Sequence, residues 1–150
     1  VFDAVVPPLA RAFHPDVIVT QHGCDPHYLD PLTHLALTTA GLEIFSKRMD
    51  ALSAELCDGR WLALGGGGYE IWQVVPRVWA LVWSAVSGQR PPAAIPAPWV
   101  ERWQELAPGP LPEEFRETAG AGKAADRGVE NSNLSTAKRA LSLCLPHVRR

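Results

Sequence analysis

The sequence predicts an α/β fold with parallel strands, and three observations lead to this prediction. Residues 17–20 form an unbroken β-branched run, and residues 61–64 form a second short apolar run. An amphipathic helical pattern follows each run. Consecutive apolar residues are typical of a strand that is buried on both faces, as in a parallel sheet. The order strand, helix, strand, helix then predicts a right-handed crossover between the two strands.

The first two helices are predicted from residues that recur every three or four positions. Residues 1–13 place apolar side chains on one face, although Pro7 and Pro8 should break or restart this helix in its middle. The helix between the strands carries an apolar stripe of Leu42, Phe45, Met49, Leu52 and Leu56. Thr38 or Thr39 is its expected N-cap, and Gly59 is its expected C-cap.

The remaining elements follow the second strand. Residues 69–88 read as a second long helix, and one of its faces holds Trp72, Val75, Trp79 and Trp83. We expect that face to pack on the sheet, and Arg77 on the same helix to form a structural ion pair. A short helix is expected around residues 100–106, and a terminal helix should end at Pro146.

Composition limits the class of protein. The chain has 150 residues, of which 47% are apolar, and a formal net charge of −2. A polyanion-binding protein needs a basic surplus, so neither direct nucleic-acid binding nor a membrane partner is expected. The three cysteines are scattered and form no CxxC pair, which favours a reducing, cytoplasmic location.

Two strands alone are too few for a stable parallel sheet. We therefore expect residues 1–90 to be the C-terminal part of a larger α/β domain. Residues 91–150 are expected to be a proline-rich linker and a helical C-terminal extension.

The topology brings two loops to one edge of the sheet, because all parallel strands end on the same side. The first loop carries His22, Asp25, His27 and Asp30, and the second is the run from Gly65 to Tyr69. For Asp25, metal ligation and an ordinary Asp-Pro turn are equally supported. His22 is expected to be a hydrogen-bonded core or supporting histidine, whereas His27 and Asp30 are expected to be surface or loop-shaping residues. Cys24 is expected to be a small buried apolar group.

The glycine run allows three interpretations. A phosphate-binding loop is disfavoured because Glu70 stands where the dinucleotide fingerprint needs glycine, and the Walker pattern is absent. A flexible linker is disfavoured by the strand and helix on either side. What remains is a tight turn where the backbone approaches a ligand. Tyr69 could then donate a hydrogen bond to a substrate oxygen, or simply be an amphipathic residue at a helix start.

Together, "QHGCD" and "GGGGY" resemble the zinc-dependent histone deacetylase family, and the bacterial acetoin-utilisation deacetylases in particular. The resemblance covers residues 1–88 and implies a mainly parallel, three-layer arginase/deacetylase-like sheet domain. It also implies that Asp25 is one ligand of a catalytic zinc ion, Zn²⁺. Tyr69 would assist catalysis, and Gly67 and Gly68 would line the substrate channel.

The resemblance implies hydrolysis of an acetylated protein or a small acetylated amine. The family's other zinc ligands and its catalytic histidine pair are absent from these 150 residues, and so are its potassium sites. We therefore expect the chain to be an inactive C-terminal fragment of an active enzyme. The alternative is a non-catalytic binding or regulatory module derived from the same fold.

Overall fold

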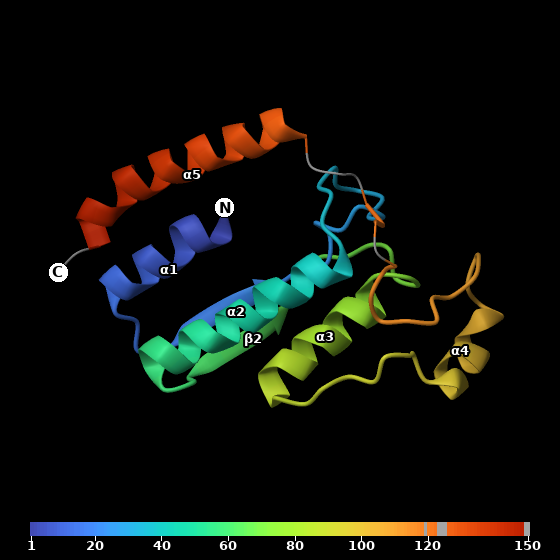
Figure 1. Cartoon of the computed structure of the whole chain (residues 1–150). Coiled ribbons are helices and arrows are strands. Elements are labelled where there is room, and N and C mark those ends of the chain that lie inside the picture. Colours follow the sequence, from blue (N-terminus) through green and yellow to red (C-terminus); the bar gives the residue numbers. More distant parts are fainter. Residues whose placement is uncertain (119, 123–125, 149–150) are drawn as a thin grey trace. The chain divides into compact units, whose positions relative to one another are not determined.

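A computed structural model of the protein describes residues 1–118, 120–122 and 126–148 (Figure 1). Its elements are, in chain order, α1 (Phe2–Phe13), β1 (Ile18–His22), α2 (Thr39–Cys57), β2 (Trp61–Gly65), α3 (Val75–Ser87), α4 (Ala97–Gln104) and α5 (Arg127–Val148). Contacts divide the chain into two compact units. The first holds residues 1–19, 49–62 and 124–150, and the second holds residues 20–48 and 63–123. The predicted domain boundary near residue 90 stays a prediction.

The two strands are parallel, as the sequence predicts. The Ile18 amide donates to the Arg60 carbonyl at the start of both strands, at 2.9 Å. The Cys24 amide donates to the Gly67 carbonyl just beyond their ends, at 2.5 Å. Because starts and ends pair with each other, β1 and β2 run in one direction, with α2 as the crossover between them.

Only one face of the strand pair is covered, so the predicted burial of both faces is wrong for the described chain. In β1, Ile18 and His22 are buried on the face where the His22 ring meets Phe45 of α2. On the other face, Val19 is 56% exposed and Leu62 of β2 is 51% exposed. Side chains alternate along a strand, so helices on one face bury only every second residue.

The caps of α2 are confirmed. The Thr38 hydroxyl accepts a hydrogen bond from the Gly41 amide at 3.2 Å, and α2 begins at the next residue. At the other end, Gly59 has a φ of +74°, the left-handed conformation that commonly closes a helix. This helix contributes Leu42 to the core of the second unit, where it meets Cys24, Val74 and Val78.

The helix after the glycine run begins later than predicted and buries a different face. It starts at Val75, with Pro76 in its first turn, rather than at residue 69. Its buried apolar residues are Val78, Leu81 and Ala85. Trp79 and Trp83 are 45% and 65% exposed, so the predicted tryptophan face is not the core face. Both faces of this helix are apolar, and the face with the smaller side chains is the buried one, where Val78 shares a core with Leu42 of α2.

Prolines interrupt the terminal helices less than predicted. α1 continues through Pro7 and Pro8, whose fixed φ is compatible with a helix although each proline lacks an amide donor. α5 passes Pro146 and ends at Val148. These two helices lie side by side in the first unit (Figure 1). α4 confirms the short helix expected near residue 100. No helix within the described residues has the length and apolar character that a membrane crossing needs.

Candidate active site

The two predicted loops meet backbone to backbone around Asp25. A Cβ atom added to Gly67 would lie 3.0–3.1 Å from the carboxylate carbon and both oxygens of Asp25. A Cβ atom added to Gly23 would overlap one of the same oxygens. The Asp25 carboxylate thus lies in a cradle that only glycines leave open. The predicted meeting of the two loops is confirmed.

Close approach also accounts for the neighbouring glycines. A Cβ atom on Gly66 would overlap the side-chain amide of Gln21. At Gly68 the φ is +149°, and a Cβ atom would lie 2.9 Å from side-chain carbons of Cys24 and Val75. An L-residue is disfavoured there by both conformation and space. The glycine run is therefore a packed turn, and the linker interpretation is wrong.

Tyr69 follows this turn with its side chain 52% exposed. Its amide donates to one carboxylate oxygen of Asp30 at 2.9 Å. The other oxygen of Asp30 accepts from the amides of Leu32 and Thr33 at 2.9 and 3.2 Å. Burial alone would raise the pKa of the Asp30 carboxyl, but these three hydrogen bonds lower it. Asp30 shapes its own loop, as predicted, and it also fixes the backbone of Tyr69, which the sequence did not indicate.

Asp25 is half-buried, and the Thr33 hydroxyl donates to its main-chain carbonyl. A carboxylate oxygen is a suitable zinc ligand. A zinc site takes three or four protein ligands, however. Within the residues that the structure describes, no three His, Cys, Asp or Glu side chains come together in a way that could hold a metal ion. These residues therefore fit zinc as one ligand and not as a complete site.

The neighbouring His22 and Cys24 are structural groups, as predicted. His22 is 5% exposed and lies 2.7 Å from the Thr20 hydroxyl, and burial lowers its pKa. Burial also raises the pKa of the Cys24 thiol to about 12, with Asp25 and Asp30 adding to the effect against a hydrogen bond with Trp79. The thiol stays protonated at neutral pH, so Cys24 is a poor metal ligand there.

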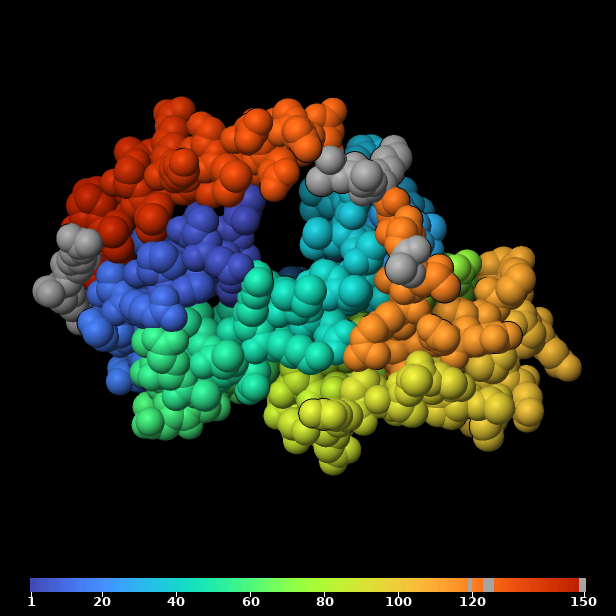
Figure 2. Space-filling model, in the orientation of Figure 1, coloured from blue at the N-terminus to red at the C-terminus, as the bar shows by residue number. Residues whose placement is uncertain are grey.

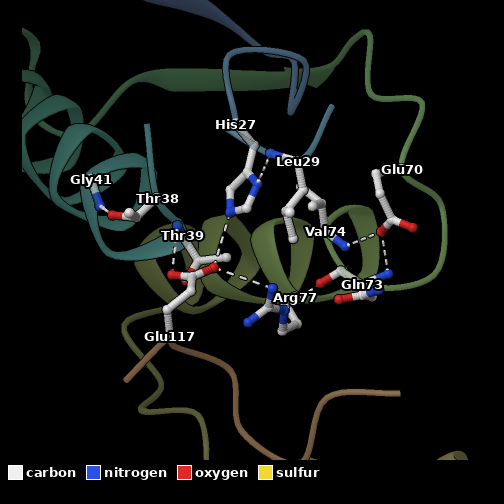
Figure 3. A network of polar contacts seen from close by, with 10 residues as sticks. All are labelled: His27, Leu29, Thr38, Thr39, Gly41, Glu70, Gln73, Val74, Arg77 and Glu117. Carbon is white, nitrogen blue, oxygen red and sulfur yellow. Dashed lines mark hydrogen bonds and ion pairs between the residues drawn. The ribbon is translucent and has the colours of Figure 1, made fainter. Parts of the chain in front are cut away.

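A buried polar network lies beside the two loops (Figure 3). His27 is fully buried, so the surface position predicted for it is wrong, and its Nε2 lies 2.9 Å from a carboxylate oxygen of Glu117. Arg77 of α3 reaches the same oxygen at 3.2 Å, which confirms the ion pair expected for this residue. The other oxygen of Glu117 accepts from the amide and the hydroxyl of Thr39, at 3.0 and 2.5 Å. No sequence signal pointed to Glu117, which lies 90 residues from His27.

The neighbours of Glu117 stabilise the ionised form of its carboxyl group. Burial alone would raise the pKa of its carboxyl. Hydrogen bonds from His27 and Thr39 and the positive charge of Arg77 outweigh that effect and lower the pKa to about 2. At neutral pH this network therefore contains a carboxylate and a guanidinium that compensate each other.

The turn before α3 is occupied by a carboxylate of the chain itself. Glu70 accepts hydrogen bonds from the amides of Gln73 and Val74, the latter at 2.9 Å (Figure 3). These are the donors that an anionic ligand would use at a helix start. The observation agrees with the rejection of a phosphate-binding loop from the glycine pattern.

The histone deacetylase domain family matches residues 1–86 of the chain. The acetoin utilization protein AcuC of Bacillus subtilis (strain 168) is 41% identical over 135 residues, which cover 89% of this chain and 35% of that protein. The AcuC protein of Staphylococcus xylosus is 40% identical over 116 residues, covering 77% of this chain and 30% of that protein. The chain thus spans about a third of the length of these curated relatives.

The fold has a counterpart among solved structures. The crystal structure of the HDA15 HD domain superimposes with a TM-score of 0.50 and 32% sequence identity, over 61% of this chain and 24% of that structure. The fold is therefore the α/β, deacetylase-like arrangement that the sequence predicts. Because the family match covers more than half of the chain, and includes both loops of the candidate site, the protein belongs to the histone deacetylase family.

Proposed function

We propose that the chain is the C-terminal part of a zinc-dependent deacetylase that hydrolyses the amide of acetyl-lysine or of a similar acetylated amine. The observation that carries the proposal is the contact between the two loops. The carboxylate of Asp25 faces Gly67, and Tyr69 follows the same glycine turn with an exposed side chain. Family membership and the AcuC relatives support deacetylation as the reaction class.

Asp25 would supply one zinc ligand, and residues outside this chain would supply the others and the general base. Bound zinc would polarise the acetyl carbonyl and activate a water molecule. Within the chain, the Tyr69 hydroxyl would donate a hydrogen bond to the carbonyl oxygen as it gains negative charge. Gly67 and Gly68 would let the substrate approach the backbone closely. Asp30 would hold the Tyr69 backbone in place through its 2.9 Å hydrogen bond.

The substrate would be an acetylated protein or a small acetylated amine, and the location cytoplasmic. The AcuC relatives are named for acetoin utilisation, which suggests an acetylated metabolic enzyme as the target. Because the described residues offer only one of the zinc ligands, these 150 residues alone should release no acetate.

The proposal is tested with the whole protein, loaded with zinc and given an acetyl-lysine peptide or an acetylated diamine. Asp25→Ala should abolish acetate release, whereas Asp16→Ala, a matched change on an exposed aspartate, should leave it unchanged. Undiminished activity in Asp25→Ala would remove Asp25 from the site. If the wild-type protein released acetate from neither substrate, a non-catalytic binding module would become the better interpretation.

A further inference from the structure

The carboxylate of Glu117 joins three elements that lead to the candidate active site. His27 belongs to the Asp25 loop, Thr39 is the first residue of α2, and Arg77 lies on α3, the helix after the Tyr69 loop. Both oxygens of Glu117 are used, one by His27 and Arg77 and the other by Thr39 (Figure 3). A single side chain thus contacts the Asp25 loop itself, the start of α2, and the helix that follows the Tyr69 loop.

The geometry of this contact is specific. The Leu29 amide donates to Nδ1 of His27 at 3.2 Å, so in the neutral ring Nε2 carries the proton and donates to Glu117. His27 and Thr39 are 0% exposed, and Arg77 is 5% exposed. Among the described residues, His27, Thr39 and Arg77 all donate to the carboxylate, and their burial leaves little room for water as a substitute partner. Loss of the carboxylate would therefore leave buried donors unsatisfied.

Glu117 comes from a part of the chain that the family match does not reach, since the match ends at residue 86. Leu111 and Phe115 of this segment are buried, and the segment belongs to the second unit. Next to Glu117, Arg116 makes a bidentate ion pair with Glu43 on α2, at 2.6 and 2.7 Å. The orange surface of this segment lies against the turquoise start of α2 (Figure 2).

We propose that Glu117 is a positioning residue of the enzyme: it holds the Asp25 loop, the start of α2 and the start of α3 in register, so that Asp25 and Tyr69 face the same substrate. This inference rests on the proposed function for the chemistry that it serves. It makes Glu117 a functional part of the active-site support. The arrangement of the two loops would then depend on a carboxylate far along the chain.

The adjacent ion pair of Arg116 provides a control. A variant of Arg116 shows whether any effect comes from the position of Glu117 or only from the attachment of the segment. Arg116 ties the same segment to the same helix, but its ion-pair partner is Glu43 and not a residue of either loop. Arg116→Gln therefore weakens the attachment and leaves the donors around Glu117 satisfied. Glu117→Gln keeps the side-chain size, but it turns an amide NH₂ toward donors in place of one oxygen.

The experiment compares hydrogen exchange and steady-state kinetics of the whole protein as wild type, Glu117→Gln and Arg116→Gln. In Glu117→Gln, amides of residues 26–33 and 39–42 should exchange roughly tenfold faster, the effect expected for one lost buried hydrogen bond to a charged group. On an acetyl-lysine peptide, kcat should fall by about tenfold or more while KM stays within about twofold. Arg116→Gln should match wild type in both readouts.

Equal exchange in the two variants would overturn the proposal, and so would a fall in kcat that Arg116→Gln shares. Hydrogen exchange does not require activity, so it judges the role of Glu117 even if the proposed reaction is wrong. If Glu117→Gln does not fold, Glu117→Asp replaces it. That variant keeps the charge, shortens the reach to His27 and Thr39, and should show the same pattern with smaller changes.

Discussion

The two compact units of this protein differ in the kind of contact that stabilises each one internally. In the second unit, buried carboxylates of Asp30 and Glu117 accept directed hydrogen bonds from several elements. In the first unit, α1 buries no residue completely and packs on α5 beside an open apolar groove. The Arg11–Glu55 ion pair of this unit is about half exposed on both sides.

The difference teaches where precise geometry is built into the chain. Apolar contact is non-directional, so it stabilises a helix pair without fixing individual atoms. A buried carboxylate with several donors permits few arrangements, because each donor has its own direction. We therefore expect substitutions of these buried carboxylates to cost more stability than substitutions in the first unit.

Asp30→Ala should have the largest effect on stability. It removes the acceptor of three amide hydrogen bonds, including that of Tyr69, from a side chain that is 6% exposed. We expect the free energy of unfolding of the whole protein to fall by about 3 kcal/mol in urea denaturation. The exposed Asp50→Ala is the control, and an equal loss in both variants would contradict the role given to Asp30.

The contribution of Glu117 should depend on pH. Its carboxyl pKa is lowered from an ordinary 4.5 to about 2, so the stabilisation is complete above pH 4.5 and is lost as the pH falls toward 2. The difference in unfolding free energy between wild type and Glu117→Gln should therefore narrow below pH 4.5. Urea titrations from pH 6 to pH 3 measure it. If the difference stayed constant over this pH range, the negative charge of Glu117 beside His27 and Arg77 would make no contribution to stability.

Gly68→Ala should have an intermediate effect on the free energy of unfolding. The new methyl group would lie 2.9 Å from carbons of Cys24 and Val75, at a φ of +149°. We expect a loss of about 2 kcal/mol in the same unfolding assay. Gly109→Ala, where nothing lies within 4 Å, should change stability by only about 0.5 kcal/mol or less. If the two variants unfolded alike, the glycine turn would be looser than described.

Glu55→Gln in the first unit should have the smallest effect. It removes the partner of Arg11 from a surface ion pair that solvent and salt screen. The melting temperature of the whole protein should stay within the scatter of repeat measurements at physiological ionic strength. A clear loss of stability, absent at high salt, would show that the first unit also depends on directed polar contacts.

Local and topological features of the chain could be predicted from the sequence. The cap residues Thr38 and Gly59 follow from local backbone chemistry, and the meeting of Asp25 with Gly67 follows from parallel strand topology. The buried face of α3 could not be predicted, because apolar periodicity identifies two faces there and packing selects one. Glu117 could not be predicted either, since it meets Thr39 across 78 residues of chain.

Tyr69→Phe in the whole protein tests the central claim most directly, with acetate release from an acetyl-lysine peptide as the measurement. Tyr28→Phe is the matched control. Tyr28 is the chain's other tyrosine, and it stacks on His27 through its ring, which phenylalanine retains. We predict that Tyr69→Phe lowers kcat by about a hundredfold or more, as loss of an oxyanion donor does, and that Tyr28→Phe does not. Equal kcat in wild type and Tyr69→Phe would contradict the account.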